Sequence, residues 1–542
     1  MAPRSSLTNP FKNFDFRLLW TATLISNLGG LIQAVGAGWM MATISQSDAM
    51  VALVQSAITL PVMIFSLAAG AFADSFDRRR VMLTAQCLMI VVSVALAVIA
   101  LTDQMTPWLL LSFTFLIGCG TALHNPSWQA SLGDIVLRED IPAAVTLNSM
   151  AFNIMRSVGP AIGGVIVAAA GAATAFALNA VSYIPLIIAL ACWKHRRLPS
   201  NLPRETFRHA ISAGLRYVAM SPNLLKVISR SFIFGLGAIA VLALLPLVAR
   251  DLIHGSAITY GLLLGSFGVG AIGGALMNTR MRETFSNETV TRIAFLGFAL
   301  SAILMAVSRQ TWLTCLCLIP AGACWVQALS LFNVTVQLST PRWVVGRTLS
   351  IYQTATFGGM AVGSWLWGIA AEAYGPTAAL FGSGAVLTLG AAIGLRFALP
   401  AFAALNLDPL NQFKEPSLRL DLRSRSGPIM IMIDYEISQE DLTDFLAVMS
   451  ERRRIRLRDG ARHWTLLRDL ENPNIWTETY HVPTWVEYIR HNLRRTQADA
   501  ENTEKLWALH RGEGRPRVHR MIERQTVHIR DDMPIKQNPE VP

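Results

Sequence analysis

Twelve long apolar segments occupy the first four hundred residues of the chain, and short polar stretches separate them. A helix that crosses the ~30 Å hydrocarbon core of a bilayer needs about 20 apolar residues. The pattern therefore predicts an all-α membrane part with twelve membrane-spanning helices. The predicted spans are Leu18–Thr43, Val51–Ala73, Val81–Leu101, Trp108–Leu132, Ala144–Ala170, Ala173–Trp193, Val227–Ala249, Tyr260–Met277, Thr291–Val307, Trp312–Leu338, Leu349–Tyr374 and Thr377–Leu399.

The connections between these spans differ in charge. The N-terminus, the even-numbered connections and the end of the last span carry 21 Lys and Arg residues, whereas the odd-numbered connections carry only Arg250 and Arg309. Because cytoplasmic loops are enriched in Lys and Arg, we expect both termini to be cytoplasmic. The net charge of +11 arises within residues 1–400. We assign it to loops beside an anionic leaflet and expect no nucleic-acid partner.

The composition changes after Pro400, where the chain becomes charged and contains no further span. Alternating apolar positions predict four strands and helix-spaced ones predict two helices, in the order βαββαβ of a ferredoxin-like α+β domain. The predicted elements are Ile429–Glu436, Gln439–Arg456, Ala461–Leu470, Ile475–His481, Val486–Leu493 and Arg517–Arg524. The predicted domains are a first six-helix bundle (1–193), a cytoplasmic connection (194–226), a second bundle (227–400), a linker (401–426), the ferredoxin-like domain (427–525) and a disordered tail (526–542).

The membrane part contains an internal repeat with an offset of 204 residues. Gly70 then aligns with Gly274, Arg138 with Arg342, and Gly159 with Gly363. Six spans therefore match six spans in the same order and orientation. Parallel repeats of this kind build one group of secondary transporters, whose substrate site lies at the midplane between the halves.

The connection after the second span contains the most specific motif, Gly70-Ala-Phe-Ala-Asp74-Ser-Phe-Asp-Arg78-Arg-Arg80. This motif resembles the cytoplasmic signature of the major facilitator superfamily. The resemblance covers residues 10–400 and implies two six-helix bundles that rock about a central cavity. Asp74 would lie near the N-terminus of the eleventh span, and a helix N-terminus attracts an anion.

We therefore expect Gly70 to permit close helix packing and Asp74 to hold the halves together when the cavity opens outward. Arg78 would pair with Asp74 or Asp77, and Arg79 belongs to the same gating group. The alternative is that the three arginines at 78–80 only fix the orientation in the membrane. Asn278 replaces the acid in the second copy, so we expect this interaction on one side only.

A second motif, Gly159-Pro160-Ala-Ile-Gly163-Gly164, resembles the fifth-span motif of exporters in the same superfamily, although Met155 stands where those exporters often have glycine. Glycines at this spacing let helices approach closely, and Pro160 favours a kink. The motif favours export over import.

Polar residues within spans are candidates for substrate binding or coupling. Arg156 either faces the cavity and an anionic substrate or extends to the cytoplasmic surface. His124 suits proton coupling because it changes charge near neutral pH, but it is equally a candidate packing residue. The other candidates are Asn27, Gln33, Asn125, Asn153, Asn333 and Gln337. No acidic residue lies at mid-membrane, so the proton as coupling ion is implied by the superfamily alone.

Other chemistries find little support. All six cysteines lie in apolar spans, where cysteine behaves as a small hydrophobic residue, and we expect no disulfide framework, metal site, catalytic residue or cofactor. The phosphate-binding motif Gly-x-x-x-x-Gly-Lys-Ser/Thr is absent, which argues against ATP-driven transport by this chain alone. We expect a transporter rather than an enzyme.

The C-terminal segment Gly460-Ala-Arg-His-Trp464, with Trp485 and His491 further on, resembles the antibiotic-biosynthesis-monooxygenase type of dimeric α+β barrel. Such likeness does not establish chemistry, and dimerisation or regulation are the roles it implies. As a whole, the chain resembles the bacterial transmembrane secretion effector group, which includes enterobactin-exporter-like proteins. This resemblance implies an inner-membrane protein that exports an amphiphilic siderophore or drug-like molecule in exchange for protons. The alternatives are an uptake symporter, a membrane-tethered oxygenase and a ligand sensor.

Overall fold

The computed structural model describes most of the chain. The described residues are 9–75, 77–136, 140–193, 207–341, 343–399, 406–407, 410, 412–423 and 425–523, apart from the side chains of 67–75 and of several residues between 130 and 157, near 207–210 and at 279. The predicted tail 526–542 and the start of the connection 194–226 lie outside these ranges.

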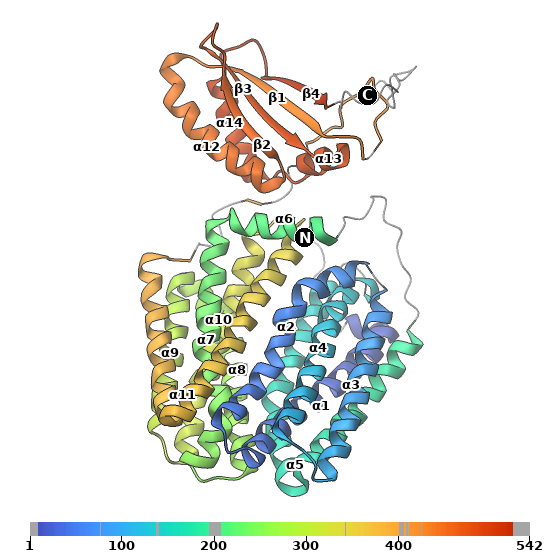
Figure 1. Cartoon of the computed structure of the whole chain (residues 1–542), viewed down its shortest axis with the longest axis vertical. Coiled ribbons are helices and arrows are strands. Elements are labelled where there is room, and N and C mark those ends of the chain that lie inside the picture. Colours follow the sequence, from blue (N-terminus) through green and yellow to red (C-terminus); the bar gives the residue numbers. More distant parts are fainter. Residues whose placement is uncertain are drawn as a thin grey trace. The chain divides into compact units, whose positions relative to one another are not determined.

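Ten described helices are long and apolar enough to cross a membrane. They form two bundles, α1 to α5 and α7 to α11 (Figure 1). Their bounds are α1 (Phe14–Ile44), α2 (Asp48–Ser75), α3 (Arg78–Leu101), α4 (Pro107–Ile135), α5 (Ile141–Cys192), α7 (Pro222–Leu247), α8 (Ala257–Thr284), α9 (Asn287–Val307), α10 (Thr311–Leu338) and α11 (Val345–Arg396). A short 3₁₀ helix (Asn9–Lys12) precedes α1, and a π-helical turn (Val248–Leu252) follows α7.

The helices α5 and α11 each supply two spans. Each has 52 residues and contains one non-helical glycine, Gly171 with φ 80° and Gly375 with φ 83°. At 1.5 Å per residue, such a helix would be about 78 Å long if straight, more than twice the thickness of the hydrocarbon core. The two helices begin, turn and end 204 residues apart. The structure thus confirms the twelve spans. The offset of the internal repeat also relates the two backbone turns.

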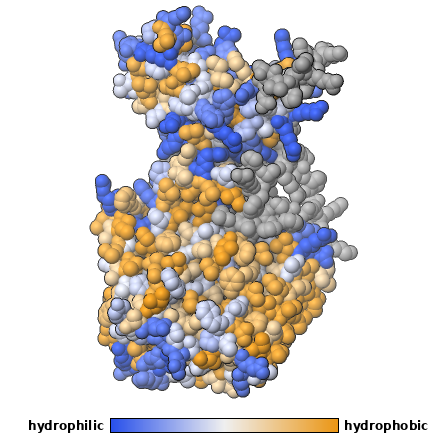
Figure 2. Space-filling view, in the orientation of Figure 1, coloured by the Kyte–Doolittle hydropathy of each residue, from blue (hydrophilic) through white to orange (hydrophobic). Residues whose placement is uncertain are grey.

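The spans present apolar side chains outward, as lipid requires. Val91, Val94 and Val98 on α3 and Val181 and Ile188 on α5 are all exposed. Figure 2 shows apolar side chains over much of the visible surface of the helical part. At the N-termini of several helices, a side chain accepts a hydrogen bond from a free backbone N–H group.

The N-terminus of α1 shows how the polar groups at a span end are satisfied. The Asn13 carboxamide oxygen accepts from the backbone N–H groups of Asp15 (2.9 Å) and Phe16 (3.2 Å). The Asn13 amide group donates to the carbonyl of Ile135, at the end of α4. One side chain therefore caps one helix and binds the end of another.

Each half has its own packed interior. In the first half, a cluster around Phe16, Trp128 and Leu190 joins α1, α4 and α5. In the second half, Phe234 on α7 lies edge-on to Phe295, 5.1 Å between ring centroids, and near Phe332. Large rings in such contacts add to the packing energy, so each bundle is held by its own core.

The C-terminal domain has the predicted ferredoxin-like plan. Its strands β1 (Ile429–Glu436), β2 (Arg462–Arg468), β3 (Ile475–Val482) and β4 (Arg517–Ile522) form one antiparallel sheet in the order β2-β3-β1-β4. The helices are α12 (Leu442–Asp459), α13 (Trp485–Leu493) and α14 (Gln497–Leu509), with a 3₁₀ turn (Gln439–Asp441) before α12. Along β1 the odd-numbered Ile429, Ile431 and Ile433 are buried in the domain core.

The structure differs from the sequence prediction at three places around this domain. Helix α14 was not predicted, because its polar sequence lacks a clear apolar stripe. The connection 194–226 contains a helix, α6 (Phe207–Ala219), and α7 begins at Pro222, five residues before the predicted span. Part of the predicted linker packs on the domain, since Phe413, Leu418 and Leu422 touch its core.

The chain divides into two compact units. One unit holds the spans. The other holds the C-terminal domain together with residues 208–222, which include most of α6, and residues 337–348, which connect α10 to α11.

Candidate functional site at the interface of the two helical halves

Alternate connections of the membrane part define two faces. The face with the odd-numbered connections, including residues 45–47, 102–106 and 248–256, is called here the low-charge face. The opposite face, with the starts of α1, α3 and α11, is called the basic face. The candidate site is the interface that the halves form between these faces.

At the basic face, the loop motif begins α3. The Asp77 side chain caps this helix by accepting from the backbone N–H of Arg80 (3.3 Å). Arg79 donates from Nε to the carbonyl of Leu190 (2.7 Å) and from Nη2 to that of Ala191 (2.6 Å). A cation at the last carbonyls of a helix is favourable, so Arg79 joins the third span to the end of the sixth. The surroundings of Gly70 and the side chain of Asp74 lie outside the described part.

The fifth-span motif packs α5 against two other helices. A Cβ atom added to Gly159 would lie 2.9 Å from Leu31 of α1, and one added to Gly163 would lie 3.1 Å from Ile32. A Cβ on Gly164 would lie 2.6 Å from the Cα of Gly261 on α8. Backbone therefore meets backbone where α5 of the first half crosses α8 of the second. Pro160 also takes part, because its carbonyl oxygen would lie 3.1 Å from a Cβ on Gly261.

At the low-charge face, Glu372 near the end of the eleventh span reaches the start of α2. Its Oε2 accepts from the Ser47 hydroxyl (2.6 Å) and from the backbone N–H of Ala49 (3.2 Å). A carboxylate at a helix N-terminus satisfies free N–H groups and interacts favourably with the helix dipole. The interaction expected for Asp74 at one face thus has a counterpart at the other.

Arg250 extends this contact. It follows α7, and its guanidinium donates to the carbonyl of Ala42 in α1 and lies 3.5 Å from Asp48 in α2. Its Nε also binds Asp251, 2.6 Å away. We call the contacts made by Ala42, Ser47, Asp48, Ala49, Arg250 and Glu372 the low-charge gate. The sequence placed Arg250 in an odd-numbered connection but could not show its partners in the opposite half.

Hydroxyl groups continue the seam between α2 and α11 toward the basic face. Ser56 donates to the carbonyl of Ala361 (2.9 Å), and Ser66 shares a hydrogen bond with Thr354 (2.6 Å). Gly368 faces Ala52, whose Cβ would lie 2.8 Å from a Cβ added to the glycine. Small residues and hydroxyls are typical of helices that pack closely in a membrane.

Within the first half, Gln33 belongs to a buried polar cluster. Its Oε1 accepts from the Asn179 side chain and from the Ser93 hydroxyl (3.2 Å). Asn179 also lies 3.0 Å from the Tyr183 hydroxyl. Gln33 is 4 % exposed and Asn179 is fully buried. This cluster connects α1, α3 and the sixth span.

His124 lies in the interior of the first half. Its Nδ1 is 3.3 Å from Nε2 of Gln86 on α3, and both residues are buried. The amide nitrogen of Gln86 is a donor, so Nδ1 accepts and Nε2 carries the proton when the ring is neutral. Within the described part of the chain, His124 Nε2 and Gln86 Oε1 have no hydrogen-bond partner.

The remaining candidates are distributed over both halves. Asn27 and Asn333 are half-buried, whereas Asn125 and Gln337 are exposed. The side chains of Asn153 and Arg156 lie outside the described part. Among the described residues, no group of His, Cys, Asp or Glu is arranged to hold a metal ion.

The C-terminal domain encloses a second polar centre. Glu478 on β3 is fully buried and accepts from Arg456 Nε (3.1 Å), Tyr435 (3.0 Å) and Trp464 Nε1 (3.0 Å), and Arg452 lies 3.5 Å away. Burial alone would raise the pKa of Glu478, but the two guanidinium groups outweigh it and lower this pKa to about 2. The carboxylate therefore stays charged inside the domain.

His491 borders this centre. Arg456 Nη1 lies 3.1 Å from its Nε2. Because a guanidinium can only donate, the ring nitrogen accepts and the imidazole is neutral. Burial, and then the charge of Arg456, hold the pKa of His491 well below its usual value.

A family model described as transmembrane secretion effector matches residues 5–527, which is nearly the whole chain. The chain belongs to this family. It is a membrane transporter of the major facilitator type, and it spans the membrane with many apolar helices.

Two similar proteins of known role support this assignment. The staphyloferrin A transporter of Staphylococcus aureus is 23% identical over 361 residues, which cover 66% of this chain and 90% of that protein. The enterobactin exporter of Citrobacter koseri is 26% identical over 411 residues, which cover 74% of this chain and 94% of that protein.

Solved structures agree on the fold of the transporter. A bacterial homologue of the human lysosomal transporter Spinster, in an inward-facing and unoccupied conformation, matches with a TM-score of 0.57 at 13% identity, covering 71% of this chain and 96% of that one. A nucleoside transporter matches with a TM-score of 0.58 at 12% identity, covering 71% and 100%.

Proposed function

We propose that this transporter exports an amphiphilic, iron-chelating small molecule from the cytoplasm by alternating access. The observation that carries the proposal is the low-charge gate. Its capping and ionic contacts join the two halves through polar groups that water can replace, so they can break and form again in each cycle. Similarity to exporters and transporters of siderophores supports the substrate class.

Orientation and domain roles follow from the charge pattern. We place the basic face, both termini and the C-terminal domain in the cytoplasm, so the low-charge gate closes the outer end of the pathway. When that gate opens, Asp74 at the basic face would take over the task of holding the halves together, as Glu372 does at the other end. The two six-helix bundles then act as the moving bodies, with the substrate between them.

Proton antiport is the proposed energy source, and His124 is the proposed coupling residue. Its support is the pair with Gln86 inside the first half. A second buried cluster in the same half, formed by Gln33, Ser93 and Asn179, supplies further polar groups. Arg156, Asn27, Asn153, Asn333 and Gln337 remain proposed substrate contacts.

Flux in sealed vesicles of known orientation tests the proposal. Inside-out vesicles from cells that make the chain should accumulate metal-free enterobactin or staphyloferrin A when a proton gradient is applied, and vesicles from cells without the chain should not. A protonophore should abolish the accumulation. Uptake only into right-side-out vesicles would establish import instead. If neither compound moves in vesicles of either orientation, the substrate class is refuted.

A further inference from the structure

The C-terminal domain contacts two segments that connect the spans. One is α6, which lies in the connection between the halves, and the other is the segment 337–348 between α10 and α11. Both segments belong to the same compact unit as the domain. Three arginines and two aromatic rings make the contacts.

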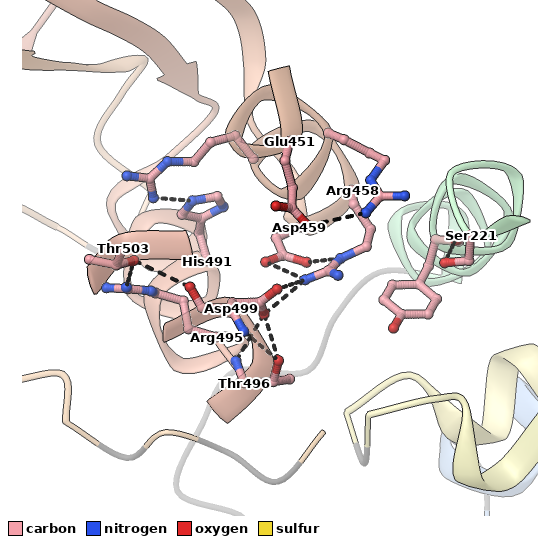
Figure 3. Close-up of polar contacts among 12 residues, drawn as sticks. Ser221, Glu451, Arg458, Asp459, His491, Arg495, Thr496, Asp499 and Thr503 are labelled. Carbon is pink, nitrogen blue, oxygen red and sulfur yellow. Dashed lines mark hydrogen bonds and ion pairs between the residues drawn. The ribbon is translucent and has the colours of Figure 1, made fainter. Parts of the chain in front are cut away.

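The first contact is between Arg458 and the ring of Tyr217 on α6, with the guanidinium carbon 5.3 Å from the ring centroid. Two carboxylates fix the orientation of this guanidinium. Asp459 binds its Nε (2.9 Å), and both oxygens of Asp499 bind its Nη2 (3.0 and 2.9 Å). Figure 3 shows Arg458, Asp459 and Asp499 with these contacts. The edges of the guanidinium are thus used within the domain, and its flat face is left for the aromatic ring.

The Asp499 carboxylate is itself held in place. It accepts from the backbone N–H (3.0 Å) and hydroxyl (2.7 Å) of Thr496, in a capping box at the start of α14. The unpredicted helix α14 therefore positions the counterion of Arg458.

The second contact is between Arg494 and the ring of Trp343, 4.3 Å from the guanidinium carbon to the ring centroid. The Arg494 side chain is 7 % exposed and donates to the carbonyl of Asp459 (3.1 Å). The rings of Trp343 and Tyr217 meet edge to face, with centroids 5.8 Å apart. One continuous cluster thus joins α6, the segment 337–348 and the domain.

The cluster also contains like charges. Arg216 on α6 donates from Nε to the carbonyl of Arg458 (3.4 Å). Burial, and then repulsion by Arg494 and Arg462, lower the pKa of Arg216. Gly460, with φ 121°, leaves room for Arg216, because an added Cβ would lie 3.3 Å from its Nη2. Arg216 therefore enters this contact against the repulsion of neighbouring arginines.

We propose that this face of the C-terminal domain is an intramolecular docking surface that restrains the two connections and slows alternating access. Only Met220 and Ser221 separate α6 from α7, and Ser221 donates to the carbonyl of Tyr217 (2.7 Å). The segment 337–348 leads directly into α11, which forms the seam with α2. Docking therefore restrains α7, the first helix of the second half, together with α11.

Amide hydrogen exchange of the purified full-length chain tests the docking surface. The substitution Tyr217→Leu removes the ring that meets both Arg458 and Trp343, whereas Tyr217→Phe keeps it. We expect Tyr217→Leu to raise exchange about fivefold in residues 343–348 and 455–461, which is the size expected for one lost cation–π contact. We expect Tyr217→Phe to resemble the parent chain. Unchanged exchange in both segments would overturn the proposal.

A second pair of variants excludes local unfolding of α6 as the cause. Trp343→Leu should raise exchange in residues 211–219 and 455–461, and Trp343→Phe should have little effect. Arg468→Gln removes a charge from the same domain where Arg468 stacks on Trp476, 5.0 Å away, and it should leave residues 211–219 unchanged. A response to Arg468→Gln equal to that of Trp343→Leu would show general destabilisation and refute a specific surface.

The effect on flux rests on the proposed function. In the inside-out vesicles, Tyr217→Leu should raise the initial rate of enterobactin or staphyloferrin A accumulation about twofold or more, and Tyr217→Phe should not. Raised exchange with unchanged flux would leave the docking surface and refute its role as a brake. Absence of flux in the parent chain would refute the transport proposal, while the exchange data would still decide the docking surface.

Discussion

Glu372 shows how much one side chain contributes to this transporter. It reaches from the end of the eleventh span to the start of the second, and so joins two spans whose sequences lie more than 300 residues apart. A carboxylate at a helix N-terminus contributes about 0.3–1 kcal/mol. Such an interaction can close a gate, yet it is weak enough to release within a transport cycle.

Replacement of Glu372 by glutamine should open the low-charge gate more often. We expect amide exchange in residues 47–52 to rise about two- to fivefold, as the loss of the helix-dipole interaction predicts. Asp103→Asn, the same acid-to-amide change in the connection 102–106 of the low-charge face, serves as the control. Equal exchange in the two variants would contradict the role of Glu372.

Asp74 should matter at the opposite face. Asp74→Asn should cut siderophore flux in vesicles while the protein still reaches the membrane in normal amount, because a neutral amide interacts more weakly with a helix N-terminus. Flux is measured per molecule of transporter in the membrane. Undiminished flux would argue that the motif only sets the orientation of the chain.

Glu478 gives the C-terminal domain a pH dependence. Its pKa is lowered from the ordinary 4.5 to about 2, so the charged form stabilises the fold at and above pH 4.5. This stabilisation, on the order of 3 kcal/mol, is lost as the pH falls toward 2. Glu478→Gln should therefore speed pepsin cleavage within residues 427–523 at pH 4.5, and the difference from the parent chain should shrink toward pH 2. Glu440→Gln, in the turn before α12, is the control.

At the scale of elements, the crossing of α5 and α8 determines how closely the halves approach. Gly164 and Gly261 meet backbone to backbone, so no side chain separates the two helices there. A contact without side chains lets one helix slide past another, since nothing interlocks. Elsewhere along the seam, hydroxyls such as those of Ser56 and Ser66 make the contacts.

A single methyl group should disturb this crossing. Gly164→Ala places a Cβ 2.6 Å from the Cα of Gly261, and overpacking of this kind costs about 1–3 kcal/mol. We expect a lower melting temperature in detergent and lower flux. Gly30→Ala in α1 is the matched control, because nothing lies within 4 Å of its added Cβ. Equal melting temperatures would show that the helices separate without cost.

The sequence located most of the elements but not their partners. Apolar length located the spans, and alternation located the four strands, because both depend on local pattern. The roles of Arg79 and Glu372 depend on helices distant in sequence, so no local pattern could have revealed them. Helix α14 was missed because its apolar positions are few, and its capping box at Thr496 and Asp499 was the available signal.

At the scale of the whole molecule, the spans make the chain a transporter, and we propose that the C-terminal domain restrains them. The similar siderophore proteins match over two thirds to three quarters of this chain, which is close to the share taken by the membrane part. A family model nonetheless extends to residue 527. Within its compact unit, the C-terminal domain contacts Tyr217 of α6 and Trp343, and these contacts carry the proposed restraint.

Removal of the domain should separate these two roles. A chain that ends at residue 426 should keep siderophore flux at or above that of the full chain, because the spans are complete and the docked segments are released. Initial rates in inside-out vesicles measure this, normalised to the amount of transporter. Complete loss of flux, with the truncated protein present in the membrane, would support a direct role of the domain instead.

The glycine turns at 171 and 375 have a practical consequence for labelling the low-charge face of this protein. Spans five and six, and spans eleven and twelve, join at these glycines without a surface loop. An inserted epitope or protease site would therefore disrupt the helix pair before it became accessible. The connection 102–106 offers five residues between helix ends and is the better place for such a tag. Reporter insertions should be accepted at that connection and rejected at both glycines.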